Sequence, residues 1–373
     1  MEAIETFARK RSNMDNDLSR TAGTSVITIP VVVHVLFHQG YENISDEKIR
    51  NQIEVLNRDF RRRNADTINT PPYFKSLAAD CEIEFKLATS DPRKRNTNGI
   101  VRKYSPIEWW NADDKMKFTS EMGDDAWDAN SYLNIWVCNL DQVAGYSSVI
   151  GGPADKDGVV LGFNVFGSNG TDGFTMGRTA VHEVGHWFSL KHTWGDADCG
   201  DDLVDDTPKQ STYTSGCPSA IRISCGNGPN GNMYMDYMDF TDDACMNMFT
   251  YGQKARMRAL FAPGGLRNSI LSSTGLDAPL IVESQLPVES PKWLHPQLYP
   301  NPATAEMILD LTYDTRWMGK MITIFSLQGQ IVMQLPINSK IPKINVSKLQ
   351  PGMYFLSAKK DDGEFIKQKF IKL

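Results

Sequence analysis

The chain has 373 residues, of which 41% are hydrophobic, and this length is sufficient for one large domain and a second, smaller one. Its 39 Lys and Arg residues are outnumbered by 45 Asp and Glu residues, and the net charge of −6 argues against nucleic-acid binding, which needs clustered positive charge. Because no apolar run is long enough to span a bilayer, we expect no transmembrane segment.

Residues 1–24 are expected to be the remnant of a pro-segment. The stretch 1–20 is charged and polar, shows no pattern of core burial and contains no apolar signal core. We therefore expect a form of the protein that lacks its signal peptide.

Residues 25–273 are predicted to form one α+β domain. A run rich in β-branched residues predicts a strand at 27–37, and further strands are expected at 82–88 and 133–140. A capping signal at Ser45 opens a helix whose apolar residues recur every three or four positions, namely Ile49, Ile53, Leu56 and Phe60. Two later helices are expected, one near 179–190 and one at 254–261.

The most informative run is 182–192, which reads His-Glu-Val-Gly-His-Trp-Phe-Ser-Leu-Lys-His. On a helix, His182 and His186 lie one turn apart on the same face and can bind one metal ion. Glu183 is placed to act as a general base on water, and His192 can supply a third ligand. Three protein ligands leave one position open for water, which is the arrangement of a catalytic zinc site.

The alternative interpretation of this run is a helix that carries two surface histidines. The whole chain contains only 6 histidines, however, and three of them lie here beside a suitably spaced glutamate. The sequence therefore favours a hydrolytic zinc site.

Four cysteines lie in a loop-rich stretch, namely Cys199, Cys217, Cys225 and Cys245. They form no Cys-x-x-Cys pair, so a structural zinc knuckle is not expected. The segment has little apolar surface to bury, and disulfides are therefore its natural cross-links, which indicates an oxidising, exported setting. Four cysteines can form two disulfides in three different ways, and their spacing does not decide among these three. Cys81 and Cys138 lie in strand-like runs and can be either buried thiols or a third bridge.

The C-terminal part of the chain has a different pattern. Residues 274–294 contain several prolines and few aromatic residues, which predicts a linker. Residues 295–373 contain short alternating strands with turn signals about every ten residues, which predicts a small all-β sandwich.

A Met-x-Tyr signature follows the histidines, at 232–237. Together with the histidine motif it resembles the metzincin metallopeptidases, in which a methionine turn lies beneath the metal and a tyrosine lies beside it. The resemblance implies that Met235 is the structural methionine. It also implies that Tyr237, together with the zinc, stabilises the oxyanion of the reaction.

The resemblance extends to one metzincin family, the pappalysins. It covers roughly residues 21–270 and is carried by the stretches 29–35, 133–138, 151–153, 204–208 and 237–247. It implies a zincin fold, in which a twisted mixed sheet packs on a backing helix and an active-site helix. It also implies a secreted zinc endopeptidase that acts on proteins or peptides.

Within this resemblance, residues 144–168 correspond to the rim of the cleft and its edge strand. An unpaired strand edge can bind an extended peptide through main-chain hydrogen bonds, whereas the alternative is an ordinary hairpin. Ser189 is a departure, because metzincins have glycine there. The chain must leave the helix at this point, and we expect Ser189 to adopt a positive φ at a cost of about 1 kcal/mol.

The pappalysin resemblance also favours the disulfides Cys199–Cys225 and Cys217–Cys245. It implies a structural calcium ion in the acidic loop between the cysteines, with Asp202, Asp205 and Thr207 as ligands. The alternative for this loop is a solvated acidic segment without an ion.

Asp242 and Asp243 follow the methionine turn, where metzincins form the pocket for the residue after the scissile bond. Acidic walls would favour Arg or Lys in that pocket. The competing interpretation is that both carboxylates are simply exposed to solvent.

The C-terminal sandwich resembles the sorting domains of type IX secretion substrates, and the basic and apolar ending at 367–373 fits those domains. The resemblance implies that a bacterial secretion machinery is a partner and that the protein is secreted or at the cell surface. The alternative is a sandwich that binds carbohydrate or protein.

Some pappalysins are zymogens in which a pro-segment cysteine silences the metal. The matching position here is Ala22, so inhibition would need another ligand, such as the carboxylate of Asp15 or Asp17. The alternative is a leader that makes no contact with the cleft.

Two other functions are open at this point. One is a non-catalytic peptide-binding protein on a zincin scaffold, against which the presence of Glu183 argues. The other is a metal-dependent hydrolase of a non-peptide substrate, against which the peptide-binding edge strand and the methionine turn argue.

Overall fold

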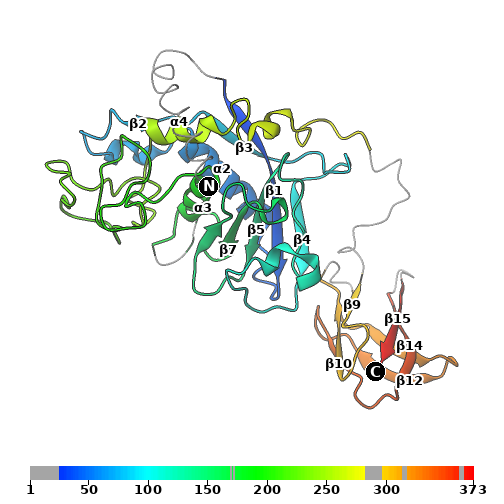
Figure 1. The fold of residues 1–373 in the computed structure, drawn as a ribbon. Coiled ribbons are helices and arrows are strands. Elements are labelled where there is room, and N and C mark those ends of the chain that lie inside the picture. Colours follow the sequence, from blue (N-terminus) through cyan, green and yellow to red (C-terminus); the bar gives the residue numbers. More distant parts are fainter. Residues whose placement is uncertain (1–24, 169, 171–172, 282–295, 313–316, 361–364) are drawn as a thin grey trace. The chain divides into compact units, whose positions relative to one another are not determined.

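The computed structural model describes residues 25–168, 170, 173–281, 296–312, 317–360 and 365–373. The chain divides into two compact units, Met1–Val282 and Glu283–Leu373 (Figure 1). The expected pro-segment, with Ala22, Asp15 and Asp17, lies outside the described residues, and so does most of the expected linker. The domain boundaries at 24, 273 and 294 stay predictions.

The first unit is built on a six-stranded mixed sheet with the order β3-β1-β5-β7-β6, in which β4 also pairs with β1. The strands are β1 (Ile27–Phe37), β3 (Ile83–Leu87), β4 (Ile100–Tyr104), β5 (Leu133–Cys138), β6 (Gly145–Ser147) and β7 (Val159–Gly162). All pairs are parallel except β6 with β7, so β6 is an antiparallel edge strand.

The central strand β1 is buried along almost its whole length, as its β-branched composition predicts. Alternate residues point to opposite faces of the sheet. Val31, Val33 and Val35 belong to the large core shared with the helices, whereas Leu36 packs with Trp136 on the other face.

Two helices pack on the first of these faces and contact each other: α2 (Asp46–Phe60) and α3 (Arg178–Trp187). The hydroxyl of Ser45 accepts a hydrogen bond from the backbone N–H of Lys48, so the predicted cap is present. The four predicted apolar positions of α2 are all buried. These observations confirm the α+β zincin arrangement of a sheet with a backing helix and an active-site helix.

A third helix, α4 (Tyr251–Ala259), starts three residues before its predicted beginning, because Thr250 and Gln253 form a capping box there. Thr250 also ends the short strand β8 (Phe249–Thr250), which pairs with β2 (Ala78–Ala79). Short 3₁₀ turns occur at Ala65–Asn69, Lys115–Lys117, Thr119–Glu121, Ala154–Lys156 and Asn268–Ser272.

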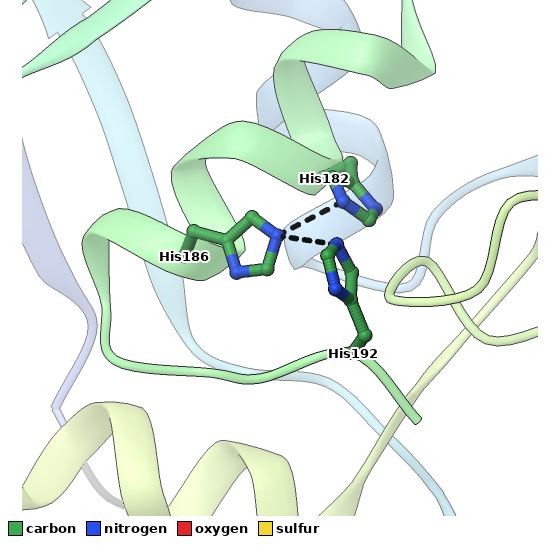
Figure 2. A group of neighbouring side chains, drawn as sticks. All are labelled: His182, His186 and His192. Atoms are coloured by element: carbon green, nitrogen blue, oxygen red, sulfur yellow. Dashed lines mark hydrogen bonds between the residues drawn. The ribbon is translucent and has the colours of Figure 1, made fainter. Parts of the chain in front are cut away.

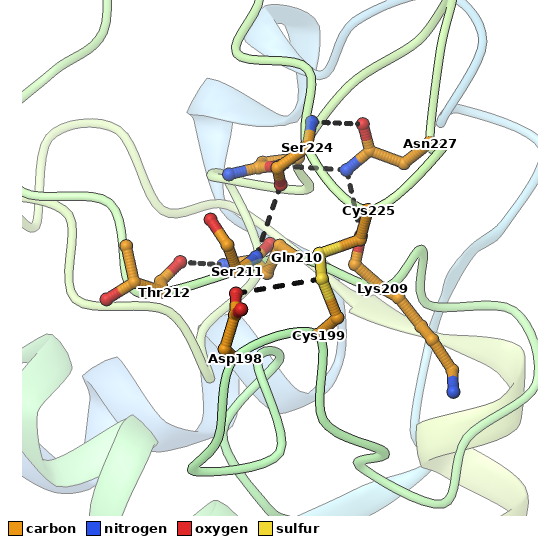
Figure 3. Close-up of a disulfide and its surroundings, with 10 residues drawn as sticks. Asp198, Cys199, Lys209, Gln210, Ser211, Thr212, Ser224, Cys225 and Asn227 are labelled. Carbon is orange, nitrogen blue, oxygen red and sulfur yellow. Dashed lines mark hydrogen bonds between the residues drawn. A yellow bond between two sulfur atoms is a disulfide. The ribbon is translucent and has the colours of Figure 1, made fainter.

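The segment between α3 and β8 has no regular secondary structure and is cross-linked by two disulfides. These are Cys199–Cys225 and Cys217–Cys245, with Cα–Cα distances of 5.6 and 5.7 Å, so the expected interlocked pairing is confirmed. Around the first bridge, Asn227 Nδ2 donates to the carbonyl of Lys209 at 2.9 Å (Figure 3). Cys81 and Cys138 are free and buried, which answers the question that the sequence left open.

The second unit consists of two small antiparallel sheets around one core, as expected for a small all-β sandwich. One sheet has the order β13-β10-β9, with β9 (Gln297–Tyr299), β10 (Glu306–Asp310) and β13 (Lys343–Asn345). The other has the order β12-β11-β14-β15, with β11 (Met321–Ser326), β12 (Ile331–Pro336), β14 (Gly352–Lys359) and β15 (Phe365–Lys372). The core includes Leu309, Trp317, Ile324, Leu356 and Phe370.

None of the helices in the described residues has both the length and the apolar character that a membrane crossing requires.

Candidate metal centre

The three histidines of the motif meet at one point. His182 and His186 come from α3, and His192 comes from the chain that turns back after it (Figure 2). The Nε2 atom of His186 lies 3.0 Å from Nε2 of His182 and 3.0 Å from Nε2 of His192. The predicted one-turn spacing on a common helix face is therefore present, and the third ring closes the group.

In each of the three rings, Nδ1 lies on the side away from the other two histidines and is hydrogen-bonded to an oxygen acceptor. Nδ1 of His182 lies 2.7 Å from the carbonyl oxygen of Tyr237, and Nδ1 of His186 lies 2.8 Å from the carbonyl oxygen of Leu190. Nδ1 of His192 contacts Oδ1 of Asp196. Because carbonyls and ionised carboxylates only accept hydrogen bonds, each Nδ1 carries the proton and each Nε2 presents its lone pair to the centre. This donor set fits a zinc ion.

The surroundings keep two of these rings neutral, as metal ligation requires. Burial and the neighbouring His186 and His192 hold the pKa of His182 well below its usual value. Burial, followed by the proximity of His192, lowers the pKa of His186 to about 4. The charged form of either ring is disfavoured at neutral pH.

The chain leaves α3 at Ser189, whose φ of 68° confirms the expected left-handed conformation. The turn is held by Arg256 of α4, which donates from Nε to the Ser189 carbonyl at 2.7 Å and from Nη2 to the Ser189 hydroxyl at 3.2 Å. Glycine could adopt this backbone without strain but could not offer the hydroxyl. The hydrogen bond to the serine side chain therefore offsets part of the cost of about 1 kcal/mol.

Glu183 is buried beside the edge strand β6. A Cβ at Gly145 would lie 3.1 Å from Cγ of Glu183 and 2.9 Å from the carbonyl oxygen of Val160. Glycine at this position therefore allows the edge strand to approach the active-site helix closely. Burial raises the pKa of Glu183 to about 8.

The expected positions of Met235 and Tyr237 are wrong. Met235 packs in a separate cluster with Met233 and Met248. The side chain of Tyr237 is fully buried, with its ring 4.8 Å from that of Phe249 and 5.5 Å from the Arg178 guanidinium. Only the backbone carbonyl of Tyr237 meets the histidines, so its hydroxyl does not lie at the metal centre.

The residues that occupy the expected places are Met238 and Phe240. A Cβ on Gly185, between the two helical histidines, would lie 2.4 Å from Sδ of Met238. The ring of Phe240 lies 5.3 Å from that of His182 and 4.7 Å from that of His192. The sequence contains two successive Met-Asp-aromatic triplets, 235–237 and 238–240, and the second is the one whose side chains lie against α3 and the histidine rings.

Two further aromatic residues beside the site were missed by sequence reasoning. Trp194 stacks on His192 with the ring centroids 4.2 Å apart and the planes at 4°. Tyr213 lies 5.6 Å from Phe240 and is half exposed. Single aromatic residues in an irregular loop carry no periodicity, so no sequence pattern pointed to them.

The two acidic residues expected in the substrate pocket have different environments. Asp243 is 2% exposed, and its Oδ2 accepts from the backbone N–H of Met176 at 2.7 Å and of Arg178 at 3.2 Å. Through these hydrogen bonds Asp243 stabilises the start of α3. The expectation that Asp243 lines a substrate pocket is wrong. Asp242 is partly exposed, two residues after Phe240.

The expected calcium ligands are only partly brought together. Oγ1 of Thr207 lies 2.7 Å from Oδ2 of Asp202, and both residues are buried. Asp205 is exposed. Burial raises the pKa of Asp202 to about 7.

Two segments of the chain match known families. Residues 117–262 match the family described as Pregnancy-associated plasma protein-A (Peptidase_M43). Residues 297–372 match the family described as Secretion system C-terminal sorting domain.

Similar proteins include an extracellular metalloprotease of Pyricularia oryzae, which is 34% identical over 65% of this chain and 77% of its own length. Another, from Verticillium alfalfae, is 47% identical over 62% of this chain and 77% of its own length.

Among solved structures, mirolysin in complex with a compound is 47% identical, with a TM-score of 0.65 over 66% of this chain and 97% of that one. A promirolysin of Tannerella forsythia is 44% identical, with a TM-score of 0.66 over 71% of this chain and 91% of that one. The chain therefore belongs to the pappalysin family (Peptidase_M43) and is a secreted or cell-surface zinc metallopeptidase with a C-terminal type IX sorting domain.

Proposed function

We propose that the protein is an endopeptidase whose zinc is held by His182, His186 and His192 and whose general base is Glu183. The observation that carries the proposal is the convergence of three Nε2 atoms, with that of His186 3.0 Å from each of the other two and every Nδ1 bonded to an acceptor on its outer side. When bound, zinc supplies a Lewis acid that lowers the pKa of water towards neutrality.

Glu183 is positioned for proton transfer between the attacking water and the leaving amine. It follows His182 directly on α3 and is buried next to β6. Burial alone raises its pKa to about 8, and a neighbouring dication would favour the carboxylate form that a base requires. The side chain would accept a proton from the water that attacks the peptide carbonyl, and then donate it to the amine.

Tyr237 is not assigned the stabilisation of the oxyanion, contrary to what the metzincin resemblance implies. Its hydroxyl is buried away from the histidines, and the ring beside them belongs to Phe240, which has no hydrogen-bond donor.

The edge strand β6 supports a polypeptide substrate. Within the part of the chain that the structure describes, β6 pairs with β7 alone, and Gly145 at its start lies close to Glu183 of α3. An extended peptide could add to this edge through main-chain hydrogen bonds while its scissile bond reaches the metal centre. Asp242, which is partly exposed and follows Phe240 by two residues, is our remaining candidate for a preference for Arg or Lys after the scissile bond.

The test is a substitution of the base. Glu183→Gln should keep the fold and the zinc and slow the cleavage of denatured proteins by about 10²- to 10⁴-fold, because proton transfer is lost. Cleavage products would be identified by mass spectrometry with and without a zinc chelator, and the same data give the residues at the cleavage sites.

Glu54→Gln, which changes an exposed glutamate of α2, is the matched control. Cleavage by Glu183→Gln at the wild-type rate would overturn the role of Glu183. Binding of peptides without any cleavage by the wild type would instead indicate the non-catalytic alternative.

We also propose a structural calcium ion at the acidic loop, with Asp202 and Thr207 as ligands and Asp205 moving in from solvent. The support is the buried Asp202 carboxylate, whose pKa burial raises to about 7. A bound cation would remove the cost of ionising this group, and oxygen ligands of this kind suit calcium.

For the second unit we propose a role in export through a type IX secretion machinery. It folds around a core of its own, so a chain that ends near residue 275 should remain catalytic. Export of that shortened chain from a type IX-competent host would overturn the role in sorting.

A further inference from the structure

The three histidines are oriented by different kinds of group. Nδ1 of His182 and Nδ1 of His186 contact backbone carbonyls, those of Tyr237 and Leu190. Nδ1 of His192 contacts a side chain, the carboxylate of Asp196. The orientation of His192 therefore depends on one particular amino acid.

The local backbone brings Asp196 back to the ring four residues earlier. Gly195 and Asp196 both have a positive φ, of 61° and 59°, and the N–H of Gly195 donates to the carbonyl of His192 at 2.8 Å. Aspartate tolerates this conformation better than most residues. Three residues further on, the Cys199–Cys225 bridge fixes the end of the same turn to a distant part of the loop (Figure 3).

Trp194 and Asp196 constrain different properties of the His192 ring. Trp194 stacks on the face of the ring, with centroids 4.2 Å apart, and so limits its tilt. Stacking does not determine which nitrogen carries the proton. The carboxylate at Nδ1 determines the position of this proton, because it accepts a hydrogen bond from Nδ1–H. The lone pair therefore lies on Nε2, which faces His186.

We propose that Asp196 is a positioning residue for the metal centre, which it serves by holding His192 in the tautomer and orientation that bind zinc. Its negative charge also makes the imidazole a stronger donor. This inference rests on the proposed zinc site and adds a residue that does not itself touch the metal or the substrate. The carboxylate is 59% exposed, so its removal leaves no buried charge without a partner.

The test measures zinc affinity by competition with a chromophoric chelator in the full-length protein. Asp196→Ala should weaken zinc binding by about 10- to 100-fold, the usual effect of removing such a carboxylate. Asp196→Asn should weaken it less, because the amide oxygen can still accept the Nδ1 proton. Asp198→Ala is the matched control, because it removes the same charge from an exposed position of the same turn.

The melting temperature of the metal-free variants separates positioning from a merely structural role. We expect metal-free Asp196→Ala to melt only slightly below the metal-free wild type, because alanine tolerates the left-handed backbone less well than aspartate, while its zinc affinity falls by the full factor of about 10 to 100. Equal zinc affinities of Asp196→Ala and Asp198→Ala, or a fall in affinity matched by a fall in metal-free stability, would overturn the inference. Failure of the wild-type chain to bind zinc would overturn the proposed metal centre itself.

Discussion

Helix α3 and the loop that follows it each contribute to the same group of histidines, but they are stabilised in different ways. His182 and His186 come from a helix whose inner face belongs to the large core with α2 and the sheet. His192 comes from an irregular segment whose contacts are made by single side chains, namely Asp196 at the His192 ring and Arg256 at Ser189, and which two disulfides cross-link. In the helix, apolar burial and backbone hydrogen bonds position the ligands, whereas in the loop individual side chains do so.

Removing the Cys199–Cys225 bridge should give the largest change in stability and should affect the loop selectively. The double substitution of both residues by serine is expected to cost about 2–5 kcal/mol, because the bridge closes a long loop in the unfolded chain. Hydrogen exchange followed by mass spectrometry should show faster exchange at 193–232 and little change in α3. Equal acceleration in both regions would contradict the separation of helix and loop.

The pH dependence of stability should identify Asp202 as a buried acid of the loop. Its pKa is raised to about 7 from the ordinary 3.8, so between these values the folded state binds more protons than the unfolded state. The free energy of unfolding of the calcium-free protein should therefore fall as the pH rises from 3.8 to 7, by at most about 4 kcal/mol from this group.

The matched variant for this prediction is Asp202→Asn, which cannot ionise and should lose that part of the slope. Calcium should stabilise the wild type above pH 7 and stabilise Asp202→Asn much less. Denaturant unfolding at several pH values, with and without calcium, measures both effects. Identical curves for the two proteins would mean that Asp202 is solvated or that no calcium binds.

The smallest expected effect concerns the junction between the two regions, at Ser189. Ser189→Ala keeps the left-handed strain and loses the hydrogen bond from Arg256, so it should cost about 1 kcal/mol. Ser189→Gly loses the same bond but also the strain, so its stability should lie close to that of the wild type. Thermal unfolding of the two variants gives the comparison. If the glycine variant is less stable than the alanine variant, backbone strain at Ser189 does not determine the difference in stability between them.

The sequence was most informative where residues of one kind recur with the period of a helix or follow one another in a strand. The apolar spacing of α2, the β-branched run of β1 and the helical spacing of His182 and His186 each predicted what the structure contains. The positive φ at Ser189 was also predictable, because the chain must reverse there to return His192 to the site.

The loop was less predictable because its contacts join residues that have no shared period. The two Met-Asp-aromatic triplets are similar as sequence, and only tertiary contacts distinguish them, such as the approach of Met238 to Gly185 and of Phe240 to His182. Asp242 and Asp243 are adjacent and chemically identical, yet only Asp243 accepts hydrogen bonds from the start of α3. Such tertiary contacts decide which of two equivalent residues has which role.

The central claim is that one zinc ion is bound jointly by the helix and the loop. X-ray absorption at the zinc edge tests this claim most directly, on the wild type and on His192→Ala loaded with one equivalent of zinc. We predict three imidazole ligands and one further light-atom ligand in the wild type, with one imidazole fewer in the variant. Sulfur in the coordination shell, or the same number of imidazoles in both proteins, would contradict the account.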